Sequence, residues 1–169
     1  MKAASPIVLS LALVAGAAQA GRSCEQRTPE AINVQRAMTL AQHTAAALDA
    51  SGAQVVVLAR AGQDLSKYGL AWSHLGLAYK DGARWRVVHK LNQCGSAQAA
   101  VYRQGLGEFF LDDLYEYKAA VVIPPTAVQM KLLDALRDNA RVTRLNTPAY
   151  SMVAYPWSQR YQQSNQIGR

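Results

Sequence analysis

The sequence is poor in the residues that most directly mark a function, with two cysteines and three histidines in 169 residues. Its most apolar stretch covers only residues 7–17, which is too short for a permanent membrane span. The formal net charge is +7, but no run of basic residues is longer than two. A scattered positive charge is typical of a solvated basic surface, so we expect no nucleic-acid partner.

The first twenty residues predict a signal peptide. Lys2 precedes the apolar stretch at 7–17, and the small residues of AQA at 18–20 are typical of a cleavage site. Cleavage after Ala20 would leave residues 21–169, which is long enough for a single domain with one core. We therefore expect a periplasmic or secreted protein with no transmembrane segment after processing. Its charge favours acidic polymers of the cell envelope as weak partners.

The hydrophobic pattern predicts an α+β domain, an antiparallel sheet with flanking helices. A Thr-Pro-Glu start at 28–30 and the glycine at Gly52 bound the first helix. The expected order is helix, three strands, short helix, strand, helix and strand. These elements cover residues 28–52, 53–61, 71–79, 84–92, 94–107, 115–125, 126–140 and 150–157.

The stretch SHLGLAYKDGARWRVVHK, residues 73–90, predicts a β-hairpin that carries two of the three histidines. If Asp81 and Gly82 form a two-residue turn, Lys80 and Ala83 face each other. Continuing that register makes His74 and His89 direct partners on one face of the hairpin, with Cβ atoms about 5 Å apart. A slip of one residue would place them on opposite faces.

Three interpretations of the histidine pair are open at this point. Two half-buried strand histidines bonded to the backbone are the most ordinary, and the pattern alone favours them. A metal site needs three or four ligands, and no nearby Cys, Asp or Glu completes one, so we expect no metal or cofactor. The third interpretation is a catalytic base held in one tautomer by a second group, with a nucleophile from another element.

A cysteine pair and an aspartate pair also offer reactive side chains. Export would place Cys24 and Cys94 in an oxidising compartment, so we expect one disulfide between them. Cys94 also precedes a predicted helix start, where thiols are activated, and is a second candidate nucleophile in competition with the disulfide. Asp112 and Asp113 predict a solvated turn, because adjacent side chains point apart.

Several sequence words resemble those of a family of uncharacterised secreted bacterial proteins, a domain of unknown function. The words are GQDLSKYGLAWSHLGLAY, VVHKLNQCG, GLGEFFLDD and YSMVAYPWSQRYQQSNQ. This resemblance covers most of the chain that follows the predicted leader. It implies export and a shared fold, and it brings no activity with it.

A more distant resemblance links SHLGLAY and the next strand to circularly permuted papain-like enzymes, which include NlpC-type peptidases and lecithin–retinol acyltransferase relatives. This resemblance implies a permuted papain-like core in which His74 is the base and His89 the orienting residue. The nucleophile of these enzymes comes late, at a helix start, where this chain has Ser164 in YQQSNQ. Because the sequence stops at Arg169, we expect the C-terminal helix to be truncated.

Two functions follow from these resemblances. The first is a hydrolase or acyltransferase of the cell envelope that acts on an amide or ester of a peptide or acyl substrate, with His74, His89 and Ser164 as its catalytic residues. The second is a secreted binding protein that retains the fold without an active nucleophile. Serine in place of the thiol favours the second, and the paired histidines favour the first.

Overall fold

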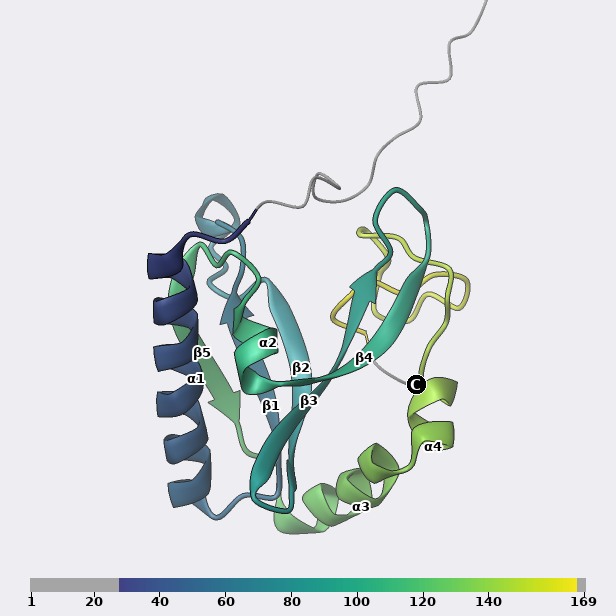
Figure 1. Ribbon diagram of the computed structural model, residues 1–169. Coiled ribbons are helices and arrows are strands. Elements are labelled where there is room, and N and C mark those ends of the chain that lie inside the picture. Colours follow the sequence, from purple (N-terminus) through teal and green to yellow (C-terminus); the bar gives the residue numbers. More distant parts are fainter. Residues whose placement is uncertain (1–27, 167–169) are drawn as a thin grey trace, which may run out of the picture.

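The computed structural model describes residues 28–166, in which five strands form one antiparallel sheet of order β4-β3-β2-β1-β5 (Figure 1). A two-residue turn makes the β2–β3 pair antiparallel, and the pairs β1–β2, β3–β4 and β1–β5 are antiparallel as well. The strands are β1 (Val55–Ala61), β2 (His74–Asp81), β3 (Arg84–Asn92), β4 (Ala99–Gly105) and β5 (Glu116–Val122).

Helices cover both faces of the sheet, so the α+β class with an antiparallel sheet and flanking helices is confirmed. The helices are α1 (Ala31–Ser51), α2 (Leu106–Phe110), α3 (Thr126–Arg137), α4 (Asn139–Arg144) and the 3-10 helix η1 (Ser66–Tyr68). Within residues 28–166, none of them is long and apolar enough to cross a membrane. The predicted leader lies outside these residues.

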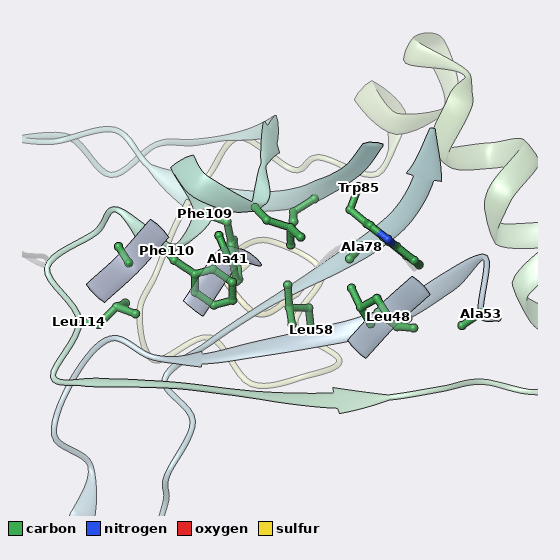
Figure 2. Packing of buried hydrophobic residues seen from close by; sticks show 13 residues of the cluster. Ala41, Leu48, Ala53, Leu58, Ala78, Trp85, Phe109, Phe110 and Leu114 are labelled. Carbon is green, nitrogen blue, oxygen red and sulfur yellow. The ribbon is translucent and has the colours of Figure 1, made fainter. Parts of the chain in front are cut away.

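The first core lies between the sheet and the helices α1 and α2. Small residues such as Ala37 and Ala41 let α1 lie close to the sheet, and Phe109 and Phe110 of α2 are fully buried beside them (Figure 2). The side chains that alternate toward this face in β1, β2 and β3 include Leu58, Ala78 and Val87. This is also the face that carries the two histidines.

The second core lies on the other face, under α3 and α4. Val55, Tyr79 and Val88 pack there against Leu133 and Leu136. The predicted helix at 126–140 is two helices, because Asp138 accepts hydrogen bonds from Ala140 N and Arg141 N and so caps α4. From α4 the chain returns to the sheet, and residues 146–166 run beside β3 and β4 without forming a regular strand (Figure 1).

Two elements differ from the expectation. The predicted helix at 94–107 is wrong, because residues 99–105 form β4 and satisfy the outer edge of β3 along seven residue pairs. The predicted strand at 150–157 is also wrong. Only isolated bridges join this region to its neighbours, Gln98 with Ala149 and Tyr150 with Gln162, and residues 151–160 are turns and loops.

The hairpin exists, but its register differs from the predicted one by two residues. Asp81 pairs with Arg84, so the turn consists of Gly82 and Ala83. Gly82 has a φ of 59°, and a glycine with positive φ in the first central position is typical of a type II′ turn. Because the shift is even, side chains keep their face, and both histidines still point to the α2 side.

Candidate functional site

The two histidines are diagonal neighbours on adjacent strands, not direct partners as predicted. His74 begins β2, where it pairs with Arg60 of β1. The observed register, extended by one pair, places His89 of β3 opposite Gly76. Glycine at this point leaves space beside the strand, and the two imidazoles approach each other across it.

The imidazoles form a hydrogen-bonded chain with Gln104. His74 Nε2 lies 2.9 Å from His89 Nδ1, and His89 Nε2 lies 2.7 Å from Gln104 Oε1. The histidine rings are nearly perpendicular, at 76°, with centroids 5.1 Å apart. The chain therefore runs diagonally over β2, β3 and β4, and it excludes the interpretation of two strand histidines bonded only to the backbone.

Burial keeps His89 neutral. This side chain is 0% exposed, and desolvation lowers its pKa from the ordinary 6.5 to about 4. The Arg60 guanidinium acts in the same direction, whereas the hydrogen bond to Gln104 and the charges of Asp112 and Glu108 oppose it. At neutral pH, His89 accordingly carries a single ring proton.

That single ring proton determines which atom donates and which accepts in each of the two hydrogen bonds. Gln104 Oε1 accepts only, so Nε2 of His89 must donate to it, and Nδ1 of His89 is left as an acceptor. His74 then donates from Nε2 to this acceptor. In neutral His74, Nδ1 is therefore the nitrogen with the lone pair, and the tautomer of the predicted base is set by two residues behind it.

Helix α2 and an ion pair enclose the histidines. The Phe109 ring lies 5.9 Å from the His74 ring and 5.2 Å from the His89 ring, centroid to centroid. The Arg60 guanidinium lies over the same phenyl ring at 4.7 Å, donates to the Phe109 carbonyl and pairs with Asp112. Asp112 lies in a bend and its side chain is 46% exposed, in keeping with the predicted solvated turn, and the ion pair also anchors the loop after α2 to the buried Arg60.

His74 borders a cavity of about 520 Å³ that Ser164 also lines. The charged residues Arg60 and Asp112 belong to its lining. Its apolar lining residues come from two loops and the end of β3, and are Leu65, Leu70, Trp72, Leu91, Tyr150 and Met152. The structure therefore brings the predicted base and the predicted nucleophile position to the same cavity, although they are far apart in the sequence.

Asn165 fixes the segment that carries Ser164. Its Oδ1 accepts from Leu75 N at 2.9 Å, and its Nδ2 donates to Ser73 O at 3.4 Å. These two backbone groups flank His74. The expected helix start at Ser164 is not present, because Gln163 N donates to Gln166 Oε1 and Gln166 N to Gln163 O, which makes residues 163–166 a turn.

Cys94 lines the same cavity, in the exposed loop between β3 and β4. The helix start that was expected to activate it does not exist, because β4 follows. Its predicted disulfide partner, Cys24, lies outside the described residues, and the pairing stays a prediction.

Residues 47–167 match the model of a family described as "Uncharacterized protein conserved in bacteria", DUF2145. The chain belongs to this family. The expected resemblance to an uncharacterised bacterial family is thereby confirmed, and the matched region of this DUF2145 protein includes all five strands and every residue of the site. No curated protein and no solved structure matches the chain.

Three parts of the DUF2145 site were missed by sequence reasoning. Gln104 lay in a segment that was assigned to a helix, and Asn165 and the Arg60–Asp112 pair depend on contacts between distant segments. For Gln104 a signal existed. In a third antiparallel strand after the hairpin, alternate residues of 99–105 share the histidine face, and the observed register shows that these are the even-numbered ones.

The depressed pKa of His89 predicts a stability that falls as the pH is lowered. As pH falls from 6.5 toward 4, the unfolded chain takes up a proton at residue 89 before the folded protein does. The free energy of unfolding should therefore decrease by up to about 3 kcal/mol across this window. Urea unfolding at pH 7 and pH 4.5 measures the effect. The decrease should be much smaller in His89→Leu and unchanged in His43→Gln, a variant of an exposed histidine.

Proposed function

We propose that this protein is a hydrolase or acyltransferase of the bacterial cell envelope, acting on an amide or ester through Ser164 and His74. The observation that carries the proposal is the His74–His89–Gln104 chain at the edge of a cavity that Ser164 shares. Nucleophilic catalysis requires a base oriented by a second group and a hydroxyl from another element, and here both groups line one cavity.

The reaction would proceed in two balanced steps. Ser164 Oγ attacks the carbonyl carbon of the substrate while its proton passes to His74 Nδ1. His74 then returns that proton to the leaving amine or alcohol as the bond to the carbonyl carbon breaks, which leaves an acyl-serine. Water, or the alcohol or amine of an acceptor, attacks the acyl-serine by the same route in reverse and releases the acyl group from Ser164.

His89 assists without changing its own charge. When His74 takes up a proton it becomes a cation, whose Nε2–H still points at His89 Nδ1. Because burial lowers the pKa of His89 to about 4, this acceptor stays neutral and does not compete for the proton at pH 7. Gln104 holds the His89 ring in the orientation that makes this possible.

The apolar residues in the lining of the cavity favour a substrate with an apolar part. Leu70 and Met152 are exposed at the cavity, and Trp72 contributes an aromatic ring to the same lining. Export of the chain, implied by the predicted leader, would bring it to the envelope. A permuted papain-like relationship remains part of this proposal, supported by the order of base, orienting residue and late nucleophile along the chain.

Labelling with a fluorophosphonate tests the proposal directly. The reagent reacts with activated serines, and Ser164 Oγ would displace fluoride to form a stable phosphonyl-serine. We expect one label per chain, located at Ser164 by peptide mass spectrometry and absent in Ser164→Ala. Ser96→Ala, at an exposed serine, is the matched control and should label normally. Absence of label from the folded wild-type protein would refute the serine nucleophile.

A binding function is the second candidate. It is favoured by the turn at residues 163–166, because a turn lacks the helix dipole that helps to activate a nucleophile. In this case the cavity would bind a peptide or acyl group without cleaving it. Such a protein would leave the fluorophosphonate unreacted, and Ser164→Ala would change no reaction rate.

A further inference from the structure

Lys90 is buried next to the His74–His89–Gln104 hydrogen-bonded chain, but on the other face of the sheet. It follows His89 in β3, so the two side chains point in opposite directions. Lys90 is 0% exposed, and its Nζ donates three hydrogen bonds: to Asn146 Oδ1 at 2.7 Å, Thr147 O at 2.6 Å and Gln162 Oε1 at 2.6 Å. These match the three donors of an ammonium group.

All three acceptors belong to one segment, residues 146–162, which we call the C-terminal loop. Its two ends are joined through Gln162, whose Oε1 also accepts from Thr147 N at 2.8 Å. Backbone bonds from Gln162 N to Ala149 O and from Ser151 N to Gln162 O close the same junction. The Lys90 ammonium therefore lies at the base of this loop, where the chain enters and leaves.

The chain that leaves this junction reaches the cavity directly afterwards. Ser164 thus lies between two anchors, with Gln162 bonded to Lys90 on one side and Asn165 bonded to the backbone around His74 on the other. The C-terminal loop itself supplies Tyr150 and Met152 to the cavity. Loss of the Lys90 anchor would free the segment that defines this side of the site.

The cost of burying a cation points to a specific role. The three acceptors are neutral amide and carbonyl oxygens, and burial lowers the pKa of Lys90 from its ordinary 10.5 to about 8. An apolar residue would avoid this cost but would remove the donor to Asn146 Oδ1 and Thr147 O and leave Gln162 Oε1 with only the Thr147 amide. A lysine at this position does what no apolar residue can do, because it ties both ends of the C-terminal loop, Asn146–Thr147 and Gln162, to one strand.

We propose that Lys90 is a positioning residue, which holds the C-terminal loop against β3 and thereby sets Ser164 relative to His74. Two consecutive residues of one strand then organise the two halves of the site: His89 orients the base on one face, and Lys90 fixes the nucleophile segment on the other. The part that concerns Ser164 rests on the proposed function, whereas the attachment of the loop to Lys90 does not.

Hydrogen exchange tests the attachment without any substrate. The amides of Thr147, Ser151 and Gln162 are bonded within the loop junction. In Lys90→Met we expect them to exchange at least tenfold faster, while the amides paired between β2 and β3 keep their protection. Lys131→Met, at an exposed lysine, is the matched control and should leave all rates unchanged. Unchanged protection at the junction in Lys90→Met would overturn the proposal.

A milder pair of variants covers the case in which Lys90→Met fails to fold. Asn146→Ala removes one acceptor of the ammonium, and Asn146→Asp keeps the acceptor and adds a counter-charge. Exchange at Thr147 and Gln162 should be faster in Asn146→Ala than in Asn146→Asp. Equal rates in the two variants would count against the proposal, because the bond from Lys90 to Asn146 would then contribute nothing to holding the loop.

Fluorophosphonate labelling of Ser164 then tests the positioning role. Lys90→Met should lower the labelling rate at least tenfold, whereas the NMR signal of the proton between His74 and His89 should persist, since it lies on the other face of β3. A normal labelling rate combined with fast exchange would overturn the positioning role. If wild-type protein is not labelled, the proposed function fails, and the exchange experiment still decides whether Lys90 holds the loop.

Discussion

Substitution of His74 by glutamine should reduce the rate of Ser164 labelling by about 10²- to 10⁴-fold, the usual contribution of a positioned general base. Glutamine is close in size to histidine and can still bond to His89 Nδ1, but it cannot take up the serine proton. The structure should therefore be retained while the chemistry is lost. Labelling rates at several reagent concentrations separate the affinity for the reagent from the maximal labelling rate. The affinity should be nearly unchanged, and the maximal rate should fall.

The same measurement on His43→Gln provides the matched control. His43 lies on the exposed side of α1, so the identical substitution there should leave the rate unchanged. The pH dependence gives a second criterion. A reaction that needs a general base slows in acid, so the wild-type rate should depend on pH, and the His74→Gln substitution should abolish that dependence. Labelling of Ser164 at the wild-type rate in His74→Gln would exclude His74 as the base.

Local sequence patterns were sufficient to predict the three strands β1, β2 and β3, on one of which His74 lies. The β-branched run of β1 and the glycine of the hairpin turn act over a few residues, so the sequence predicted three adjacent antiparallel strands. The register was wrong because Asp81 continues the strand and Gly82 opens the turn. The predicted face of the two histidines was still correct, because side chains alternate with a period of two and the register error was also two residues.

Non-local contacts explain what sequence reasoning missed. Residues 99–105 have no strong strand signal of their own, and they become a strand because the edge of β3 must be paired. Lys90 and Gln162 are seventy-two residues apart, and no periodicity links a lysine in a strand to a glutamine in a loop. The residues that hold the candidate site together are thus those whose structural role depends on tertiary packing and not on local sequence.

Substitution of Gly76 by alanine should strongly destabilise the protein, because there is no space for a side chain at this position. A Cβ atom at this position would lie 2.6 Å from Val87 Cγ1, 3.2 Å from His89 Cβ and 3.3 Å from Val88 O. The first contact is too short to persist and the other two leave little room to move, since all three partners belong to the central strand β3. Gly76→Ala should therefore lower the free energy of unfolding by about 1–3 kcal/mol, as overpacking of a rigid core does.

A double-mutant cycle identifies the cause of that loss. Val87→Ala removes the Cγ1 atom, so Gly76→Ala should be less destabilising in the Val87→Ala background than in the wild-type protein, when both are measured by urea unfolding. Gly107→Ala is the control: its Cβ would meet only the flexible end of Met38, at 3.1 Å from Cε, and should cost little. Gly76→Ala should also disturb the His74–His89 proton in NMR spectra, because the contact with His89 Cβ moves the imidazole behind the base. Equal costs in both backgrounds would mean that Val87 does not limit the space at Gly76, and that the close approach of the two imidazoles depends on some other feature of β2.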